Sequence, residues 1–173
     1  MKKIVLVFLF VLMAFPALAG SQNGIVKLSL WDQLALAVPN NKEDVTGLDF
    51  GIGSKTTAVT GLQWDLVWAE TTYELKGVSC AWIVSMANKM QGFQTAAFVK
   101  ANDIIGAQFG VVSLANSVNG VQVGFFNQTD YLHGLQLGFV NYARDVDRGL
   151  QVGLLNVAEN GYVPVMIFVN GRF

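Results

Sequence analysis

Apolar and polar positions recur about every 14 residues from Gly47 to the end of the chain. Three late copies read Gly120-Val-Gln-Val-Gly-Phe-Phe-Asn127, Gly134-Leu-Gln-Leu-Gly-Phe-Val-Asn141 and Gly149-Leu-Gln-Val-Gly-Leu-Leu-Asn156. Positions one, three and five residues after the first glycine are apolar, whereas positions two and four hold a glutamine and a small residue. This period of two predicts that each copy forms a strand with one apolar side.

Nine copies of the unit follow one another, with steps of 14 to 16 residues between them. The ninth copy opens on Val163 and the first eight open on an anchor glycine: Gly47, Gly61, Gly77, Gly92, Gly106, Gly120, Gly134 and Gly149. A unit of this length cannot bury its own apolar side chains, so neighbouring copies must stack on one another.

The segments that join the strands also resemble one another, and this likeness favours one of two architectures. A small residue stands nine positions after the anchor, as at Ala101 and Ala115, and an apolar residue often stands twelve positions after it. In an up-and-down sheet, successive turns lie at opposite ends and need not match. In a solenoid, every coil is related to the next by one translation. We therefore predict an all-β fold, a parallel β-solenoid of about eight to nine short coils with an N-terminal cap.

Within this solenoid we expect the apolar side chains of the repeat strands to fill a narrow core. The small and aliphatic residues of the joining segments are expected to contribute to the same core. The glutamine column, from Gln94 to Gln151, is expected to face outward and to pair amide to amide. Asn127, Asn141 and Asn156 fall at strand ends. There we expect them to bond backbone groups of sharp corners, since asparagine tolerates left-handed backbone.

The chain divides into three predicted segments: a signal peptide over residues 1–19, cap strands and a loop over 20–46, and tandem repeats over 47–173. Two lysines, an apolar run over residues 4–15 and the small residues Ala17-Leu18-Ala19 have the order of a secretory signal peptide that is cleaved after Ala19. In the cap, strands are expected over residues 25–31 and 34–38. Pro164 in the last copy suits an edge strand, because proline cannot donate a ladder hydrogen bond.

The same alternation also describes an outer-membrane β-barrel, in which apolar side chains face lipid. The repeat strands and one N-terminal strand would make a barrel of eight to ten antiparallel strands. The last residues, 165–173, have apolar side chains at alternate positions and end in Phe173, which resembles the C-terminal assembly signal of such barrels. Short joining segments on both sides and the lack of clear aromatic girdles weigh against the barrel, which stays open as the alternative.

Composition narrows the classes of partner. The chain is 53% hydrophobic and 13% charged, with a formal net charge of -1. It contains no basic run or patch, so nucleic acid is not an expected partner. Cys80 is the only cysteine, so no disulfide can form within the chain. Because its neighbours are apolar, Cys80 is predicted to be a small core residue.

Residues able to carry chemistry are few and scattered. The only histidine, His133, lies in a joining segment, and Asp145 and Asp147 share another; all three are predicted to be surface residues. Asp49 and Asp65 lie on the same strand face in successive copies, two positions out of step, and would repel each other unless a cation lay between them. No catalytic, cofactor-binding or metal-ligating residue is therefore predicted, and neither an enzymatic activity nor a cofactor is expected.

The Gly-x-Gln-x-Gly-x-x-Asn unit over residues 47–170 resembles the bacterial surface-repeat proteins, which are exported chains built from tandem copies of this motif. The Leu28-Ser-Leu-Trp31 opening and the Asn160-Gly-Tyr-Val-Pro164 ending also resemble the flanks of short members. The resemblance implies export to the cell surface or outer membrane of a Gram-negative-type bacterium, and it implies no known activity.

We therefore expect a non-enzymatic protein with a structural or adhesive role that contacts an unknown surface partner or an envelope component. The alternative function follows from the alternative fold. It is that of a small outer-membrane barrel with a pore or anchoring role.

Overall fold

The computed structural model describes residues 23–32, 34–38 and 43–173. The predicted signal peptide, residues 1–19, lies outside these residues. Strands are the only regular elements in the described part, and they form one sheet in the order β2-β1-β3-β4-β5-β6-β7. They are β1 (Gly24–Trp31), β2 (Leu34–Val38), β3 (Asp44–Ala81), β4 (Val84–Thr95), β5 (Phe98–Phe109), β6 (Val112–Ala158) and β7 (Val165–Arg172). Strands β1 and β2 match the two strands predicted over residues 25–31 and 34–38.

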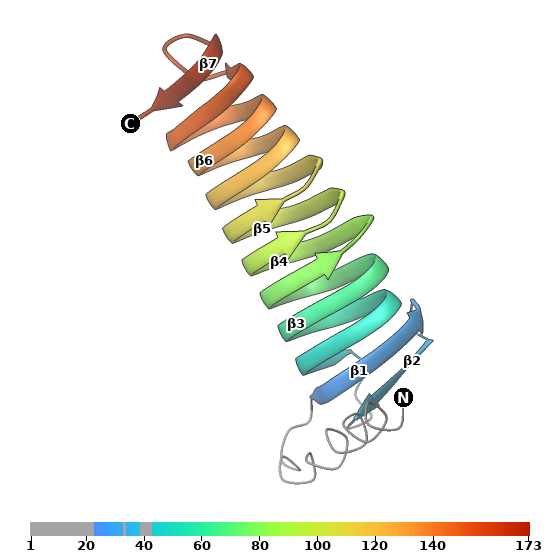
Figure 1. Cartoon of the computed structure of the whole chain (residues 1–173). Coiled ribbons are helices and arrows are strands. Elements are labelled where there is room, and N and C mark those ends of the chain that lie inside the picture. The colour runs from blue at the N-terminus through green and yellow to red at the C-terminus, as the bar shows by residue number, and fades with distance from the viewer. Residues whose placement is uncertain (1–22, 33, 39–42) are drawn as a thin grey trace, which may run out of the picture.

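The chain winds into a parallel β-solenoid whose coils follow one another along one axis (Figure 1). Strand β3 pairs in parallel with β1 and β4, and β5 pairs in parallel with β4 and β6. Anchor glycines lie opposite one another: Gly77 pairs with Gly92, Gly92 with Gly106, and Gly106 with Gly120. Equivalent positions of the repeat therefore stack, as predicted. These parallel ladders make the antiparallel barrel wrong for the described residues.

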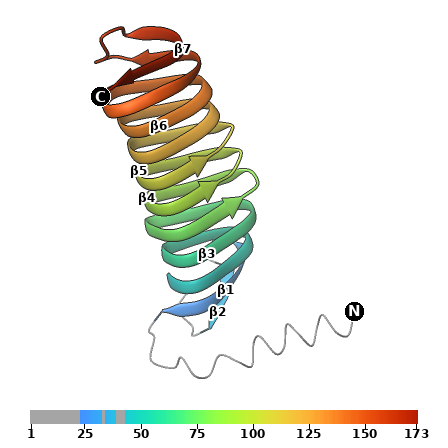
Figure 2. The same ribbon diagram turned by 60° about the vertical axis from the view of Figure 1, so that its left-hand side comes forward.

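The chain reverses direction at both ends of the sheet. Strand β2 runs antiparallel to β1, and β7 runs antiparallel to β6, with Val169 opposite Val152. The prediction that a ninth copy from Val163 stacks as a further parallel coil is therefore wrong, and β7 instead closes the end of the stack (Figure 2). The backbone N–H of Ala158 donates to the carbonyl of Pro164 at 2.9 Å, which closes the turn that sends β7 back along β6.

Coils turn at their anchor glycines. The φ angle lies between +125° and +142° at the seven anchors from Gly47 to Gly134, a region that residues with a side chain rarely adopt. A Cβ atom placed on Gly120 would lie 2.0 Å from the carbonyl oxygen of Gly106 in the adjacent coil. Glycine recurs at this position because the backbone of one coil passes directly over the backbone of the next.

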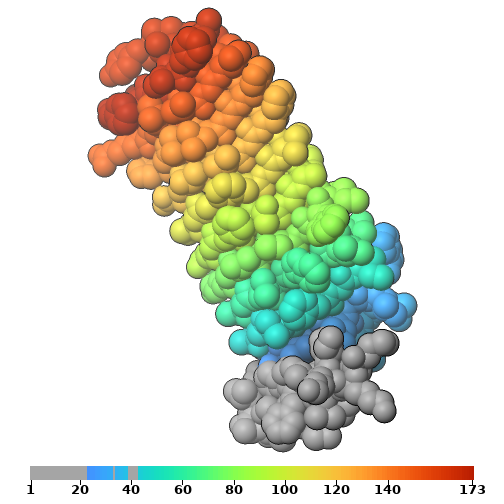
Figure 3. All heavy atoms as spheres, viewed as in Figure 1, coloured from blue at the N-terminus to red at the C-terminus, as the bar shows by residue number. Residues whose placement is uncertain are grey.

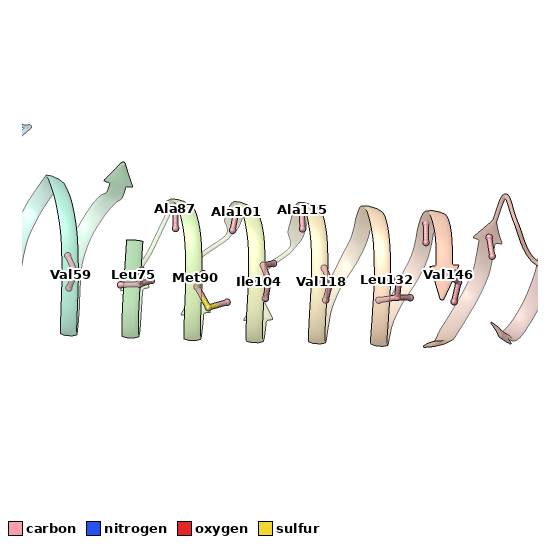
Figure 4. Close-up of a cluster of buried hydrophobic side chains, with 12 residues drawn as sticks. Val59, Leu75, Ala87, Met90, Ala101, Ile104, Ala115, Val118, Leu132 and Val146 are labelled. Atoms are coloured by element: carbon pink, nitrogen blue, oxygen red, sulfur yellow. The ribbon is translucent and has the colours of Figure 1, made fainter. Parts of the chain in front are cut away.

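The hydrophobic core is an aliphatic column contributed by the segments between the repeat strands (Figure 4). Its larger members are all buried: Val59, Leu75, Met90, Ile104, Val118, Leu132 and Val146. Alanines of the same segments, including Ala101 and Ala115, belong to the same cluster. The predicted contribution of the joining segments to the core is confirmed.

The repeat strands themselves face the opposite way from the prediction. The inward positions belong to glutamines that are 0% exposed: Gln63, Gln94, Gln108, Gln122, Gln136 and Gln151. The apolar positions beside them lie outside, where Trp64 is 46% and Phe125 59% exposed. The expectation that the apolar side chains of these strands fill the core while the glutamines face outward is therefore wrong.

The narrowness of the coil explains this inversion. At Gly138, four residues after an anchor, a Cβ atom would lie 2.4 Å from the carbonyl oxygen of Gly124 and 2.4 Å from the side-chain nitrogen of Asn127. The inward side of the strand therefore has no room for a side chain at this position. The glutamine two residues after the anchor lies beside this closed position and satisfies its amide by pairing with the glutamines of the neighbouring coils. The bulky apolar side chains of the strand, such as Trp64 and Phe125, lie on the outer side.

Candidate functional site

A continuous column of glutamine amides runs through the interior of the solenoid. Each Nε2 donates to the Oε1 of the glutamine one coil earlier: Gln108 to Gln94 at 3.2 Å, Gln122 to Gln108 at 3.0 Å, Gln136 to Gln122 at 2.8 Å, and Gln151 to Gln136 at 2.8 Å. The predicted amide-to-amide pairing is confirmed, although it occurs in the core. A buried amide without its partner would cost about 1–3 kcal/mol there.

A second buried column consists of the asparagines that end the repeat strands. Asn127 donates to the side-chain oxygen of Asn141 at 2.8 Å, and Asn141 donates to that of Asn156 at 2.8 Å. These side chains also reach backbone carbonyls, as in the bond from Asn156 to Gly153 at 2.9 Å. The predicted bonding of these asparagines to backbone groups at strand ends is confirmed. The two columns show that the polar residues of the repeat serve the interior.

The side chains that the repeat strands turn outward form a continuous surface, which we call the apolar face. Its members lie within β3, β4, β5 and β6, one, three or five residues after an anchor: Leu48, Phe50, Ile52, Leu62, Trp64, Leu66, Val78, Cys80, Phe93, Thr95, Ala107, Phe109, Val121, Val123, Phe125, Leu135, Leu137, Phe139, Leu150, Val152 and Leu154. All of them are exposed or half-exposed, none is charged, and Thr95 is the only one with a hydroxyl group. Contiguous exposed surfaces of this kind mark interaction sites.

The described residues form one continuous, elongated body (Figure 3), and members of the apolar face recur along it from β3 to β6. Eight rows at about 4.8 Å and five residues at about 3.3 Å give it an area of about 600 Å². This area lies at the upper end of the largest patches found on monomers, about 300–600 Å². Aromatic rings contact one another across rows: Phe125 and Phe139 stack with centroids 4.8 Å apart and planes 7° apart. The surface is thus preformed, because each row is held by the rows on either side.

An apolar cleft lies at the N-terminal end of this face, between β1, β2 and β3. It has a volume of about 590 Å³, and its larger lining side chains are Leu28, Leu30, Leu34, Leu36, Phe50 and Ile52. Phe50 and Ile52 belong to both the cleft and the apolar face. The apolar surface therefore continues past the first repeat onto β1, where Leu30 is 62% exposed.

Another outward side of the solenoid is polar. Asn116 donates to Asn102 at 3.4 Å, and Asn102 donates to Asn88, so a ladder of amides runs along this surface as well. Arg144 and Asp130 form an exposed ion pair at 3.5 Å on the same run of joining segments. The solenoid is therefore amphipathic across its width, with one side suited to burial and another suited to water.

A buried polar cluster occupies the interior at the N-terminal end. The Lys27 ammonium is 0% exposed and lies 3.8 Å from the Asp49 carboxylate. It donates to the carbonyl of Lys55 at 2.7 Å. The hydroxyls of Ser54 and Thr56 each donate to Asp49 at 2.7 Å. Because both charges have partners, this ion pair is satisfied despite its burial.

Asp65 lies one coil further along the solenoid and, unlike Asp49, has no hydrogen-bond partner for its carboxyl group. It is 0% exposed, and neither carboxyl oxygen has a hydrogen-bond partner. Burial, together with the nearby negative charge of Asp49, raises the pKa of Asp65 to about 8. Sequence reasoning noticed that Asp49 and Asp65 share a strand face, but it placed that face outside. It also missed Lys27, the cation of the cluster, whose only signal is a charged residue among alternating apolar positions.

The raised pKa of Asp65 makes folding stability depend on pH. The native state keeps a proton that the unfolded chain, with an ordinary pKa of 3.8, releases. The stability linked to this group is complete below about pH 4 and falls as the pH rises toward 8, by at most about 1.4 kcal/mol per pH unit. We expect urea midpoints to decrease between pH 5 and pH 8, and Asp65→Asn to flatten that decrease.

The comparison with Asp65→Asn isolates Asp65 from its charged neighbours. Asp49 and Lys27 face the same interior, and desolvation by burial lowers the pKa of Lys27. Both groups remain in wild type and variant, so the difference between the two pH profiles reports the removal of the Asp65 carboxyl group. Parallel profiles for the two proteins would contradict the assignment of a proton to Asp65 in the folded state.

The structure brings two of the other residues singled out in the sequence into an exposed contact. His133 is partly exposed, and its Nδ1 lies 3.3 Å from an Asp147 carboxyl oxygen. Asp145 instead accepts a hydrogen bond from Asn160. Cys80 is half-buried on the apolar face rather than in the core as predicted, and burial raises the pKa of its thiol. The outward position of Cys80 follows from the inversion of the repeat strands, whereas His133, Asp145 and Asp147 lie at the surface in joining segments, as predicted.

Within residues 23–32, 34–38 and 43–173, no three histidine, cysteine or acidic side chains are grouped so as to hold a metal ion. The described part of the chain also contains no helix with the length and apolar character needed to cross a bilayer. Comparisons with protein-family models, with curated proteins and with solved structures give no match.

Proposed function

We propose that this chain is an exported, non-enzymatic structural module of a bacterial cell surface, of the surface-repeat type that its motif resembles. In this proposal it acts by burying its apolar face against a surface partner or an envelope component. The observation that carries the proposal is the apolar face itself, a contiguous and uncharged surface along a stack of parallel coils.

The energetics of the face support an adhesive role. Burying about 600 Å² of apolar surface is worth about 15 kcal/mol at about 25 cal/mol per Å². Association itself costs about 4–15 kcal/mol in lost translational and rotational freedom. The apolar contribution therefore equals or exceeds this cost across its range, which supports association through the face.

The interior supports a structural role. Polar side chains that could serve recognition, such as Gln122 and Asn141, are instead hydrogen-bonded from coil to coil. Such ladders tie each module to its neighbours, which is the basis of stability in stacked-repeat proteins. In this proposal each of the eight anchors from Gly47 to Gly149 opens one coil, and β1 with β2 forms a cap over the first. Seven of these anchors have a positive φ angle, which supports the count.

Cell fractionation tests the proposal. The full chain, expressed in a Gram-negative host, is expected to lose residues 1–19 and to be digested by protease added to intact cells. A variant without residues 2–19 is expected to stay inside the cell and to be protected. Phe125→Lys on the apolar face is expected to release the exported chain into the medium, because a charge in the buried contact is costly.

Tyr131→Lys provides the matched control for the release experiment. Tyr131 belongs to the same strand as Phe125 and is 43% exposed, against 59% for Phe125, but it lies outside the apolar face. The Tyr131→Lys variant should therefore stay attached to cells. A full chain that remains unprocessed in the cytoplasm, or equal release of both variants, would show that the proposed function is wrong.

A further inference from the structure

We propose that the partner of the apolar face is a second copy of this chain, packed face to face about a two-fold axis that lies between the two faces and perpendicular to the solenoid axes, so that the two solenoids run antiparallel. The inference rests on the proposed function, because it names the partner of the surface described there. The resulting dimer is a two-sheet sandwich with the polar sides of both solenoids outward.

The size and shape of the apolar face fit a copy of itself. A stable interface buries about 800 Å² on each partner, and the face, with the surface of the adjoining cleft added to its area of about 600 Å², reaches that range. Flat sheets pack face to face at a separation of about 10 Å, with their side chains interdigitated. Rows at a common spacing of about 4.8 Å allow this register along the whole face.

The charge pattern also favours a second copy over a lipid surface. Surfaces that bind membranes combine an apolar face with unpaired lysines and arginines. Here no member of the apolar face is charged, and the formal net charge of the chain is -1. The only hydroxyl of the face, Thr95, belongs to a middle row. It therefore meets its own counterpart near the two-fold axis, where the two hydroxyls can pair.

The two ends of the face determine the antiparallel direction. The N-terminal end carries the cleft, whose lining includes Leu30 and Ile52. The C-terminal end carries β7, where Ile167 is 64% and Val169 46% exposed. Val169 lies opposite Val152 of the apolar face. An antiparallel pair places β7 of each copy against the cleft of the other, whereas a parallel pair would oppose cleft to cleft and leave both unfilled.

Thiol cross-linking of the purified mature chain tests this arrangement. In a Cys80→Ser background, Thr95→Cys is expected to cross-link to itself with a bismaleimide that spans about 10 Å, since it lies beside the two-fold axis. Val152→Cys, in the last row, is expected not to cross-link to itself, because the two copies of this residue would be about 35 Å apart. Efficient cross-linking through Val152→Cys would overturn the antiparallel arrangement.

Sedimentation measurements test the face itself. The wild-type chain is expected to be a dimer at micromolar concentration. Phe125→Lys is expected to weaken the dimer by at least about 30-fold, because it introduces an unpaired charge at a buried contact. Tyr131→Lys, outside the face, should leave the dimer unchanged. A circular-dichroism spectrum like that of wild type shows that each variant is folded.

Several outcomes separate the inference from the proposed function. A monomer at every concentration overturns the inference, as does a dimer that survives Phe125→Lys. A monomer that floats with phosphatidylcholine vesicles identifies lipid as the occupant and also overturns it. If such a monomer is still held on cells through Phe125, the proposed function stands. A face-dependent dimer formed by a chain that is never exported supports the inference and overturns the proposed export.

Discussion

Gly120→Ala is expected to destabilise the protein by at least about 4 kcal/mol, an exceptionally large loss for which backbone strain is one established cause. The new Cβ atom would lie 2.0 Å from the carbonyl oxygen of Gly106 and 2.9 Å from its carbonyl carbon. These are backbone atoms of the adjacent coil, so no side chain can move aside. Gly120 also has a φ angle of +142°, which alanine adopts only with strain. Urea denaturation followed by circular dichroism measures the loss.

Gly149→Ala is the matched control, because Gly149 occupies the same position of the repeat without the same geometry. Its φ angle is not among the positive ones, and a Cβ atom would lie 3.0 Å from the carbonyl oxygen of Gly134. The next nearest atoms, at 3.1 Å, belong to the side chains of Leu132 and Val146. We expect a loss of about 1–2 kcal/mol, typical of an ordinary substitution. Equal losses at Gly120 and Gly149 would contradict the steric explanation of the repeat.

Gln122→Leu is expected to cost about 2–4 kcal/mol even though leucine is similar in size. The substitution removes the bond from Gln122 to Gln108 and the bond from Gln136 to Gln122. The Gln108 oxygen then has no donor in a fully buried position, and such an orphaned group costs about 1–3 kcal/mol. Gln122 also stops donating to the carbonyl of Ser113, at 3.0 Å. Thermal unfolding measured at one pH tests this prediction.

The end of the same column supplies the comparison. The side-chain oxygen of Gln151 has no hydrogen-bond partner, so Gln151→Leu interrupts no donor from a further coil. It loses only the bonds that Gln151 donates to Gln136 and to the carbonyl of Val157, at 2.8 and 3.0 Å. We expect about half the loss found at Gln122. A larger loss at Gln151 would show that the column is not cooperative along the solenoid.

The sequence correctly predicted how successive coils stack along the solenoid axis. Spacing of the anchors predicted which residues lie one above another, and the pairing of Gly92 with Gly106 agrees. The likeness of the joining segments correctly favoured parallel coils over antiparallel strands. Both inferences depend on equivalence between copies, which is a property of sequence that stacking preserves. The same reasoning failed from Val163 onward, because the turn closed by Ala158 and Pro164 reverses the chain.

The apolar face was not predicted, although the sequence analysis described the repeat positions that form it. Alternation separates Gln122 from Val121 and Val123, but it is symmetrical and does not say which set faces inward. The prediction followed the usual preference of apolar side chains for the interior. Here packing outweighs that preference, because the space beside Gly138 admits no Cβ atom. The apolar face is the direct consequence of this steric limit.

The buried cluster at Lys27 and Asp49 was also predicted only in part from the sequence. Sequence reasoning found that Asp49 and Asp65 share a strand face and that a cation between them would relieve their repulsion. Lys27 is that cation for Asp49: it stands 22 residues earlier in the chain, and its Nζ lies 3.8 Å from an Asp49 carboxyl oxygen. Its contribution depends on the stacking of β1 upon β3, which brings together residues that no local pattern relates.

The sequence by itself determined the period, the strand positions and the direct stacking of equivalent residues, because these follow from repetition and from the alternation of side chains along a strand. Only the tertiary structure decided which side of each strand faces inward, where the last strand reverses, and which distant charges meet. Those outcomes depend on the width of the coil and on contacts between coils. Neither is present in any single copy of the repeat. The sequence therefore predicted which positions stack on one another, but not which side of each strand is exposed to solvent.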